Sequence, residues 1–330
     1  MNYKDIFTVA PEGQGLSNGE IEKILAKSIA QWEETNGSIR NALIIPPDFT
    51  RFHSNAGFIT QVYYSILSGK GAHVDILPAL GTHVPVSRTQ WSAMFGDIPY
   101  SEMLVHNWRT DVVKLGEVPK DEIEEISGEV PAEVVSEISG GLWKDPVDVE
   151  VNRLLMDEKY DIIISPGQVV PHEVIGMANH AKNIFVGVGG ADMINKSHMI
   201  GAVCGMEQAM GRDHTPVRRI FDYAFEKYLS KRPILWVLTV NTAPRGEIFS
   251  HGLFIGQGRN CLTEAVKLAQ KKNIDYVETG IKKCVVFLDP SEFTSTWLGN
   301  KSVYRTRMAM ADGGELIVLA PGVETFGEDP

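Results

Sequence analysis

The chain has 330 residues and a formal net charge of −11, with 43% hydrophobic and 22% charged residues, which is typical of soluble globular proteins. The negative charge argues against a nucleic-acid or anionic-membrane partner, since either needs a concentrated basic face. The N-terminus, MNYKDIFTVAPEGQG, lacks the cationic and apolar parts of a signal peptide. No window reaches the roughly eighteen apolar residues of a membrane span. We therefore expect a cytoplasmic protein.

The metal-binding patterns common in proteins are missing from this sequence. Cys204, Cys261 and Cys284 are odd in number and far apart, which fits neither a disulfide framework nor a zinc ribbon, so we expect reduced and mostly buried thiols. Neither H-E-x-x-H nor C-x-x-C occurs. A site with one histidine ligand would need its remaining ligands from a cofactor.

The first elements alternate between helix and strand. Residues 16–34 form an amphipathic helix pattern that Ser17 and Glu20 begin as a capping box. Strand patterns at 41–47 and 72–80 flank a helix pattern at 54–71. This order predicts a βαβ unit.

The same alternation continues through the middle of the chain. Strand patterns cover 160–167, 183–190 and 234–242, and helix patterns cover 215–231 and 260–273. The acidic stretch 117–141, broken by Pro and Gly, is interpreted as a surface excursion. The alternation predicts an α/β fold with a largely parallel sheet covered on both faces.

The last part of the chain contains one strand, helix and strand pattern, at 282–290, 298–314 and 315–322. A single such unit cannot bury a core alone, so it must dock on the rest or begin a further domain. We predict two Rossmann-like α/β domains. Residues 1–275 form the catalytic and cofactor-anchoring domain, and residues 276–330 form the start of a second, incomplete one.

Polar side chains follow the predicted strands at their carboxyl ends, where open parallel sheets bind ligands. Four loops contribute: Asp48, Thr50 and Arg51 follow the first strand, His83 the second, Ser165 and His172 a third, and His198 comes soon after a fourth. Each has a plainer interpretation, since a lone histidine is usually solvated or locally hydrogen-bonded. That interpretation is preferred for the other histidines: His53, His73, His106, His180, His214 and His251. For the rest, the shared edge favours function.

These residues, taken in order, resemble the lactate racemase family that depends on a nickel-pincer nucleotide. The stretch PPDFTR resembles its P-D-x-T-R loop, and GTHVP resembles its G-x-H loop. The residues His172, Lys182 and His198 reproduce its H-(x9)-K-(x15)-H spacing. The resemblance extends from about the first strand to ELIVLAPG.

The resemblance implies a role for each residue. The cofactor would be a nickel pyridinium-3,5-bisthiocarboxylic acid mononucleotide, attached covalently to Lys182 and made by separate biosynthetic enzymes. His198 would complete nickel coordination, and His83 and His172 would be the two acid/base residues. The nucleotide would be held by the loop Asp48, Phe49, Thr50 and Arg51.

The substrate end of the resemblance is weaker. Here WLGNK stands where the family has Y-Q-x-x-K, so Lys301 resembles the substrate-binding lysine, while Trp297 and Leu298 replace polar residues. These changes favour a 2-hydroxy acid bulkier than lactate. A solvated helix face is preferred for Arg305 and Arg307, and explains Lys301 almost equally well.

The resemblance predicts a racemase or epimerase that inverts the α-carbon of a 2-hydroxy acid by proton-coupled hydride transfer. A nicotinamide-dependent oxidoreductase is the second hypothesis, although GVGG lacks the full G-x-G-x-x-G fingerprint. A third is a non-catalytic carrier of the nickel nucleotide. The oligomeric state is left open.

Overall fold

A six-stranded mixed sheet forms the centre of the computed structural model, which describes residues 3–127, 137, 139–141, 146–290 and 293–327. Four neighbouring strands are parallel, and two antiparallel strands extend one side. In spatial order the strands are β1 (Ile6–Val9), β10 (Phe249–Gly256), β9 (Ile234–Thr242), β6 (Ile162–Gln168), β2 (Asn41–Ile44) and β3 (His73–Ile76). The predicted α/β fold with a largely parallel sheet is confirmed.

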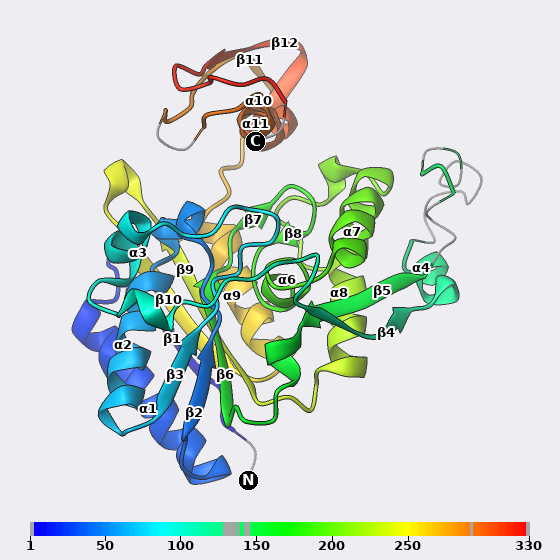
Figure 1. The fold of residues 1–330 in the computed structure, drawn as a ribbon. Coiled ribbons are helices and arrows are strands. Elements are labelled where there is room, and N and C mark those ends of the chain that lie inside the picture. The colour runs from blue at the N-terminus through cyan, green and yellow to red at the C-terminus, as the bar shows by residue number, and fades with distance from the viewer. Residues whose placement is uncertain (1–2, 128–136, 138, 142–145, 291–292, 328–330) are drawn as a thin grey trace.

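Helices cover both faces of this sheet (Figure 1). One core lies between the sheet and α1 (Asn18–Asn36), α2 (Ala56–Gly69) and α3 (Arg88–Phe95). The other lies against α6 (Ala181–Phe185), α7 (Ala191–Val203), α8 (Pro216–Tyr228) and α9 (Arg259–Lys272). Alternate residues of one strand enter opposite cores, as Leu43 and Ile44 of β2 do, because successive side chains of a strand point to opposite faces.

The acidic stretch begins in a hairpin beside the second core. Strands β4 (Val112–Val118) and β5 (Val147–Asn152) pair antiparallel, and α4 (Lys120–Ser127) follows β4. Ile123 and Ile126 of α4 are buried in the core, so this part of the excursion is packed rather than detached. A short hairpin of β7 (Pro171–His172) and β8 (Gly176–Met177) lies between β6 and α6. The 3-10 turns are Phe49–Ser54, Tyr100–Glu102, Arg153–Met156, Met206–Gln208, Pro244–Gly246 and Arg307–Ala309.

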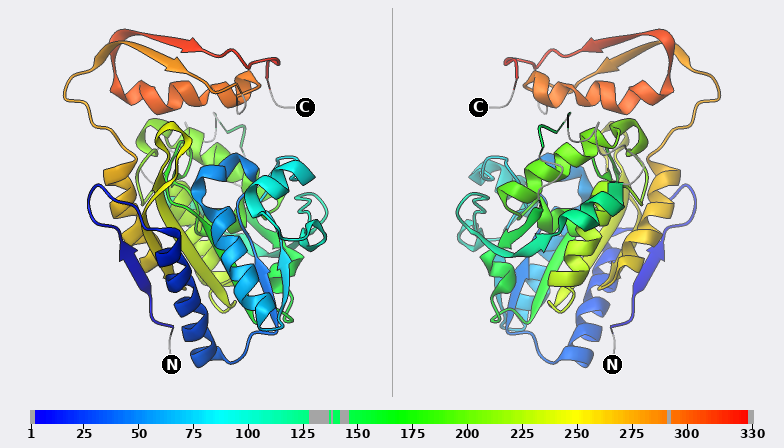
Figure 2. Two further views of the ribbon diagram at one scale, coloured as in Figure 1. Left: turned by 90° about the vertical axis from the view of Figure 1, so that its left-hand side faces the viewer. Right: turned by 90° about the vertical axis from the view of Figure 1, so that its right-hand side faces the viewer.

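A separate C-terminal unit follows α9. It contains two parallel strands, β11 (Ile281–Phe287) and β12 (Met310–Leu319). Two short helices, α10 (Thr296–Gly299) and α11 (Lys301–Thr306), connect these strands along the chain. Figures 1 and 2 show this unit above the main body, with the two short helices turned toward it. The expected boundary near residue 275 falls between α9 and β11 and stays a prediction. No helix in the described parts of the chain is long and apolar enough to cross a membrane.

Two expected elements are wrong. Residues 183–190 form the end of α6 and a turn rather than a strand. A short, fully buried apolar run does not distinguish helix from strand. Gly189 allows the turn to pass close to the end of α6, because a Cβ at this position would lie 1.9 Å from the Phe185 carbonyl oxygen. The helix expected at 298–314 ends at Thr306, and β12 begins at Met310.

Candidate active site

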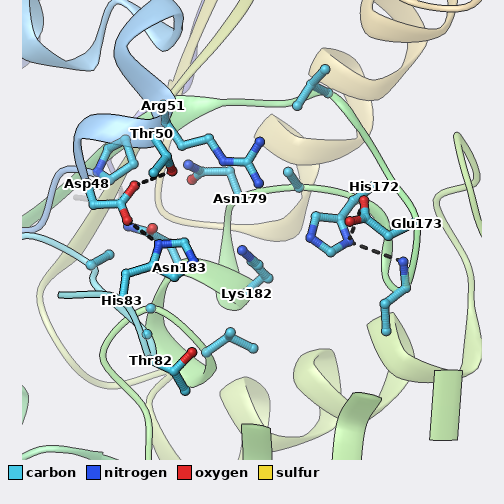
Figure 3. Close-up of a pocket in the computed structure, with 18 of the residues that line it drawn as sticks. Asp48, Thr50, Arg51, Thr82, His83, His172, Glu173, Asn179, Lys182 and Asn183 are labelled. Carbon is cyan, nitrogen blue, oxygen red and sulfur yellow. Dashed lines mark hydrogen bonds and ion pairs between the residues drawn. The ribbon is translucent and has the colours of Figure 1, made fainter. Parts of the chain in front are cut away.

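A cavity of about 390 Å³ lies beyond the carboxyl ends of the parallel strands, with the C-terminal unit on its far side. Its lining includes Asp48 after β2, His83 after β3 and His172 after β6. Lys182 and His198 line the same cavity. In the view of Figure 3, Lys182 lies between His83 and His172. The five residues are therefore brought together, as the sequence predicts.

Asp48 holds His83 in one orientation. The Asp48 Oδ2 atom lies 2.5 Å from His83 Nδ1, and the Thr50 hydroxyl donates to Oδ1 at 2.6 Å. Burial alone would raise the pKa of Asp48, but these two hydrogen bonds outweigh it and keep the pKa below its usual value. The carboxylate can only accept, so Nδ1 of His83 carries the proton. Its Nε2 lone pair is then free to accept a proton.

His172 has the opposite arrangement. The backbone N–H of Val174 donates to His172 Nδ1 at 3.2 Å, so the neutral ring carries its proton on Nε2. Burial lowers the pKa of His172 well below its ordinary value, although the neighbouring Glu173 carboxylate acts in the other direction. The ring is therefore neutral near pH 7. One histidine offers a lone pair and the other an N–H.

Lys182 lies in the first turn of α6, where its amine is buried. Burial, reinforced by the positive charge of Arg51, lowers the pKa of Lys182 to about 8. A neutral amine is thus accessible near physiological pH, as a covalent attachment to this nitrogen requires. The neighbouring Asn183 side chain donates to the Ile45 carbonyl and the Ser165 hydroxyl, both at 2.9 Å. These bonds fix α6 against β2 and β6, and they explain why Ser165 supports the site without lining it.

The backbone before Lys182 is held in an unusual conformation. Asn179 and His180 both have positive φ, 67° and 58°, which side chains with a Cβ rarely adopt. Gly167 of β6 allows this turn to approach closely, because a Cβ there would lie 1.8 Å from the Asn179 side-chain nitrogen. The buried His180 ring stacks on Trp236, with centroids 4.2 Å apart. His180 thus has a structural place rather than the solvated one preferred from sequence.

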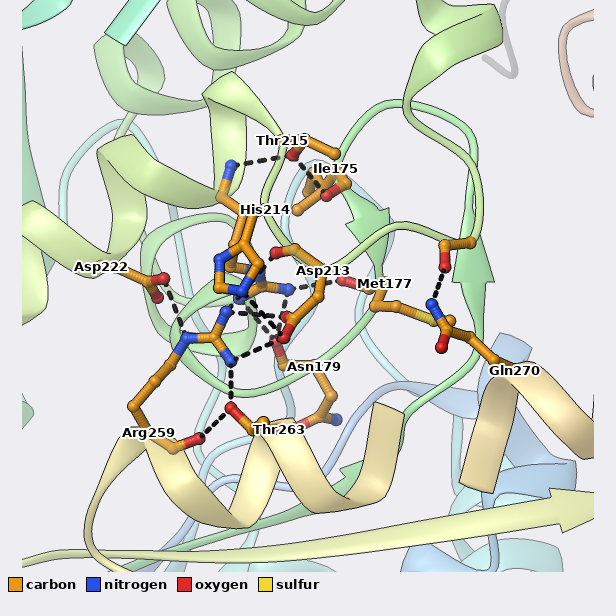
Figure 4. Close-up of polar contacts among 12 residues, drawn as sticks. Ile175, Met177, Asn179, Asp213, His214, Thr215, Asp222, Arg259, Thr263 and Gln270 are labelled. Atoms are coloured by element: carbon orange, nitrogen blue, oxygen red, sulfur yellow. Dashed lines mark hydrogen bonds and ion pairs between the residues drawn. The ribbon is translucent and has the colours of Figure 1, made fainter. Parts of the chain in front are cut away.

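A buried arginine supports this strained turn from behind. The Nη2 atom of Arg218 on α8 donates to two carbonyl oxygens, that of Met177 at 2.5 Å and that of Asn179 at 3.2 Å. Arg259 on α9 extends the polar layer by donating to Asp222 at 2.9 Å (Figure 4). Burial of a full guanidinium is tolerated because the carbonyls accept its hydrogen bonds. The layer fixes the segment that carries Lys182 into the cavity.

His198 lies on α7 rather than in a loop after a strand, so that expectation is corrected along with the strand at 183–190. Its Nδ1 lies 2.7 Å from the Ile194 carbonyl oxygen, so Nδ1 carries the proton and Nε2 keeps its lone pair. A backbone carbonyl commonly fixes metal-binding histidines in this way. Among the described residues, no group of three or more His, Cys, Asp or Glu side chains could hold a metal ion. A metal at His198 would need the rest of its ligands from a bound organic group.

The remaining predicted residues divide into two groups. Thr50, Arg51, Trp297 and Lys301 line the cavity. Phe49 is not part of the lining; its ring packs against Phe52, with centroids 5.7 Å apart.

Sequence reasoning missed several of the lining residues, among them Glu173, Asn183 and Tyr304. Glu173 directly follows a proposed catalytic histidine, and Asn183 directly follows the proposed attachment lysine. Tyr304 lies three residues after Lys301 and seven after Trp297, a spacing that places all three on one side of a helix. Neighbourhood and helical spacing were the signals that could have found them.

Comparisons with known proteins find one matching family model. The family model described as the lactate racemase N-terminal domain matches residues 140–211, the segment with His172, Lys182 and His198. A search of curated proteins finds no match.

Two solved structures have a similar fold. One is a crystal structure of a protein from Thermotoga maritima, with a TM-score of 0.75 and 22% identity, covering 93% of this chain and 72% of that chain. The other is the lactate racemase apoprotein from Thermoanaerobacterium thermosaccharolyticum, with a TM-score of 0.68 and 17% identity, covering 94% and 69%. The central segment of this chain is thus similar to the lactate racemase N-terminal domain, and the whole chain shares the fold of both solved structures.

Proposed function

We propose that this protein is a racemase or epimerase that inverts the α-carbon of a 2-hydroxy acid. The observation that carries the proposal is the pair of histidines, His83 and His172, whose Nδ1 atoms have opposite hydrogen-bonding partners in one cavity with Lys182. Inversion requires equivalent chemistry from both sides of a planar intermediate. One acid/base group for each enantiomer meets that requirement.

The residues also fit the nickel-pincer nucleotide that the family resemblance implies. Lys182 would carry the group covalently through its buried amine, and His198 would bind the nickel through Nε2. Arg51 would hold the nucleotide; both oxygens of Asp48 are occupied by His83 and Thr50, so Asp48 would act through His83. When bound, this group supplies a hydride acceptor, which the side chains of the protein do not.

The α C–H of a hydroxy carboxylate is barely acidic, so direct proton removal would need a very strong base. Transfer of the hydrogen as hydride avoids this, provided that the hydroxyl proton leaves at the same time. The Nε2 lone pair of His83 can accept that proton from one enantiomer. His172 could do so for the other once its ring proton has moved from Nε2 to Nδ1, which exchanges the hydrogen bond from the Val174 N–H. Lys301 lines the cavity and would provide the cation for the substrate carboxylate.

The first experiment uses protein produced together with the cofactor-biosynthesis enzymes, analysed by intact mass and by peptide mapping around Lys182. We expect a nucleotide-sized, sulfur-containing adduct with nickel, absent in Lys182→Ala. A panel of 2-hydroxy acids is then followed by chiral chromatography in D₂O. Interconversion with little deuterium at the α-carbon is the outcome expected of hydride transfer, whereas full incorporation would point to proton abstraction.

The histidine variants test the pairing directly. His83→Asn and His172→Asn should each lower interconversion about 10²–10⁴-fold, the usual contribution of a general acid or base, while leaving the adduct in place. Full activity in both variants would contradict the proposal. An adduct without any turnover in the wild type would instead favour the non-catalytic carrier, and an NAD(P)-dependent absorbance change would favour the oxidoreductase.

A further inference from the structure

A second carboxylate in the cavity, that of Glu173, has no role in the chemistry above. Its side chain is 18% exposed, and Oε2 lies 3.8 Å from His172 Nδ1, too far for a hydrogen bond. Glu173 lines the cavity and lies beside the His172 ring in Figure 3. Burial raises the pKa of the Glu173 carboxyl, but the His172 ring, the backbone N–H of Glu173 and the positive charges of Lys301 and Arg51 act in the other direction and hold the pKa below its usual value. The group is therefore an anion at every physiological pH.

This carboxylate has spare hydrogen-bonding capacity. An ionised carboxylate accepts about four hydrogen bonds. The backbone N–H of Glu173 supplies one of them, and no side chain among the described residues is found to donate another. Leaving most of the acceptor capacity of a largely buried charge unused is costly. Donors supplied by a ligand in the cavity would remove that cost.

The surroundings decide which donors fit. Arg51 and Lys301 both act electrostatically on Glu173, so a ligand ammonium placed there would meet two like charges. A second ligand carboxylate would meet Glu173 itself. Hydroxyl groups meet neither penalty, and the same lining offers Asn300, Tyr304 and the Trp297 ring, which are neutral hydrogen-bonding or stacking partners for a polyol chain.

We propose that Glu173 is a specificity-determining residue that selects 2-hydroxy monocarboxylates bearing further hydroxyl groups on their carbon chain and rejects dicarboxylates. This inference rests on the proposed function for its reaction. It adds a substrate class to that function, namely polyhydroxylated acids of the aldonate type. Rejection of the wrong substrate comes from charge repulsion, which is an efficient source of specificity.

The test compares two substrates of equal chain length, threonate and malate, and uses lactate as a substrate that has neither extra group. With the nucleotide-loaded protein, we expect kcat/KM to be at least about tenfold higher for threonate than for malate, the ratio that one charge-assisted hydrogen bond provides. Glu173→Gln keeps the shape but removes the charge. It should reduce this preference at least about tenfold, mainly through KM, and should also lower the ratio of kcat/KM for threonate to that for lactate, a comparison that cancels any effect of Glu173 on the pKa of His172.

Glu125→Gln, at an exposed position of α4, is the matched control and should leave all three substrates unchanged. Three outcomes would overturn the proposal. An equal loss of kcat/KM on lactate and threonate in Glu173→Gln would show that Glu173 supports His172, and a loss of the Lys182 adduct in this variant would show that Glu173 serves the cofactor. A wild-type protein that prefers malate would also contradict the proposal.

Calorimetric binding of threonate and malate separates this inference from the proposed function. If no hydroxy acid is interconverted, the proposed function fails. Glu173 would still be supported by tighter binding of threonate that Glu173→Gln weakens. Equal binding of the two acids by the wild type would sink the inference regardless of turnover.

Discussion

The main body and the C-terminal unit both contain parallel strands, but the two regions differ sharply in how these strands are covered. Eight of the nine residues of β9 are buried, because helices cover both faces of the central sheet. None of the seven residues of β11 is buried, and Val285 and Phe287 are 58% and 65% exposed. Parallel sheets are normally covered on both faces, so the second region has little packing of its own.

The same contrast divides the site. Lys182 and His172 come from the packed body, where strained backbone and buried hydrogen bonds fix them. Trp297 and Lys301 come from the C-terminal unit, and Trp297 is 60% exposed. The residues proposed to carry the chemistry thus lie on the packed region, whereas two residues proposed to contact the substrate, Trp297 and Lys301, lie on the more exposed one.

The largest difference is expected when one arginine is removed from each region. Arg218→Met should lower the free energy of unfolding by about 3 kcal/mol, because the carbonyls of Met177 and Asn179 lose buried donors. Arg307→Met should cost at most about 1 kcal/mol, since its pair with Glu207 at 2.8 Å is largely solvated. Urea denaturation of both variants measures this. Equal losses would contradict the idea that the buried arginine supports the turn before Lys182.

Acidification should also act on one region only, since residues 276–330 contain no histidine. Burial lowers the pKa of His106 and holds that of His180 well below its ordinary value. Below about pH 6.5 these histidines become protonated in the unfolded chain but stay neutral in the folded body. The free energy of unfolding of the body therefore falls as the pH falls. Each ring contributes at most about 1.4 kcal/mol per pH unit, and only between its unfolded pKa and its lower folded pKa.

Urea denaturation at pH 7.5, 6.0 and 5.0 measures this slope. The variant His180→Phe keeps an aromatic ring against Trp236 and removes one titrating group. The free energy of unfolding of this variant should fall less steeply with falling pH, by the slope that corresponds to at most one bound proton. An unchanged slope would show that His180 takes up a proton in the folded body.

The sequence predicted most of the packed region. The capping box of Ser17 and Glu20 is present at the start of α1, and the continuous apolar runs of β6 and β9 are strands. Its failures have physical reasons. The antiparallel strands β1 and β10 were missed because β1 is only four residues long and β10 interrupts its apolar residues with Ser250, His251 and two glycines. Residues 183–190 were assigned to the wrong element because complete burial hides periodicity.

For the site, the sequence predicted which strand ends converge, but not how the side chains are used. The position of His83 after β3 follows from the βαβ order, whereas its orientation by Asp48 depends on a contact between residues 35 positions apart. The buried support from Arg218 likewise depends on α8 packing behind the turn. Contacts of this kind arise only from tertiary packing, which a single sequence without known structure does not specify.

The smallest and most specific prediction compares one substitution in two parallel strands. Val237 of β9 is fully buried and Val285 of β11 is 58% exposed. Val237→Ala should lower the free energy of unfolding by about 2 kcal/mol through lost burial and a residual cavity. Val285→Ala should stay within about 0.5 kcal/mol, as is usual for surface positions. Chemical denaturation of the two variants provides the measurement. If Val285→Ala cost as much as Val237→Ala, the outer face of β11 would have to be covered in solution, and the contrast between the two regions would not hold.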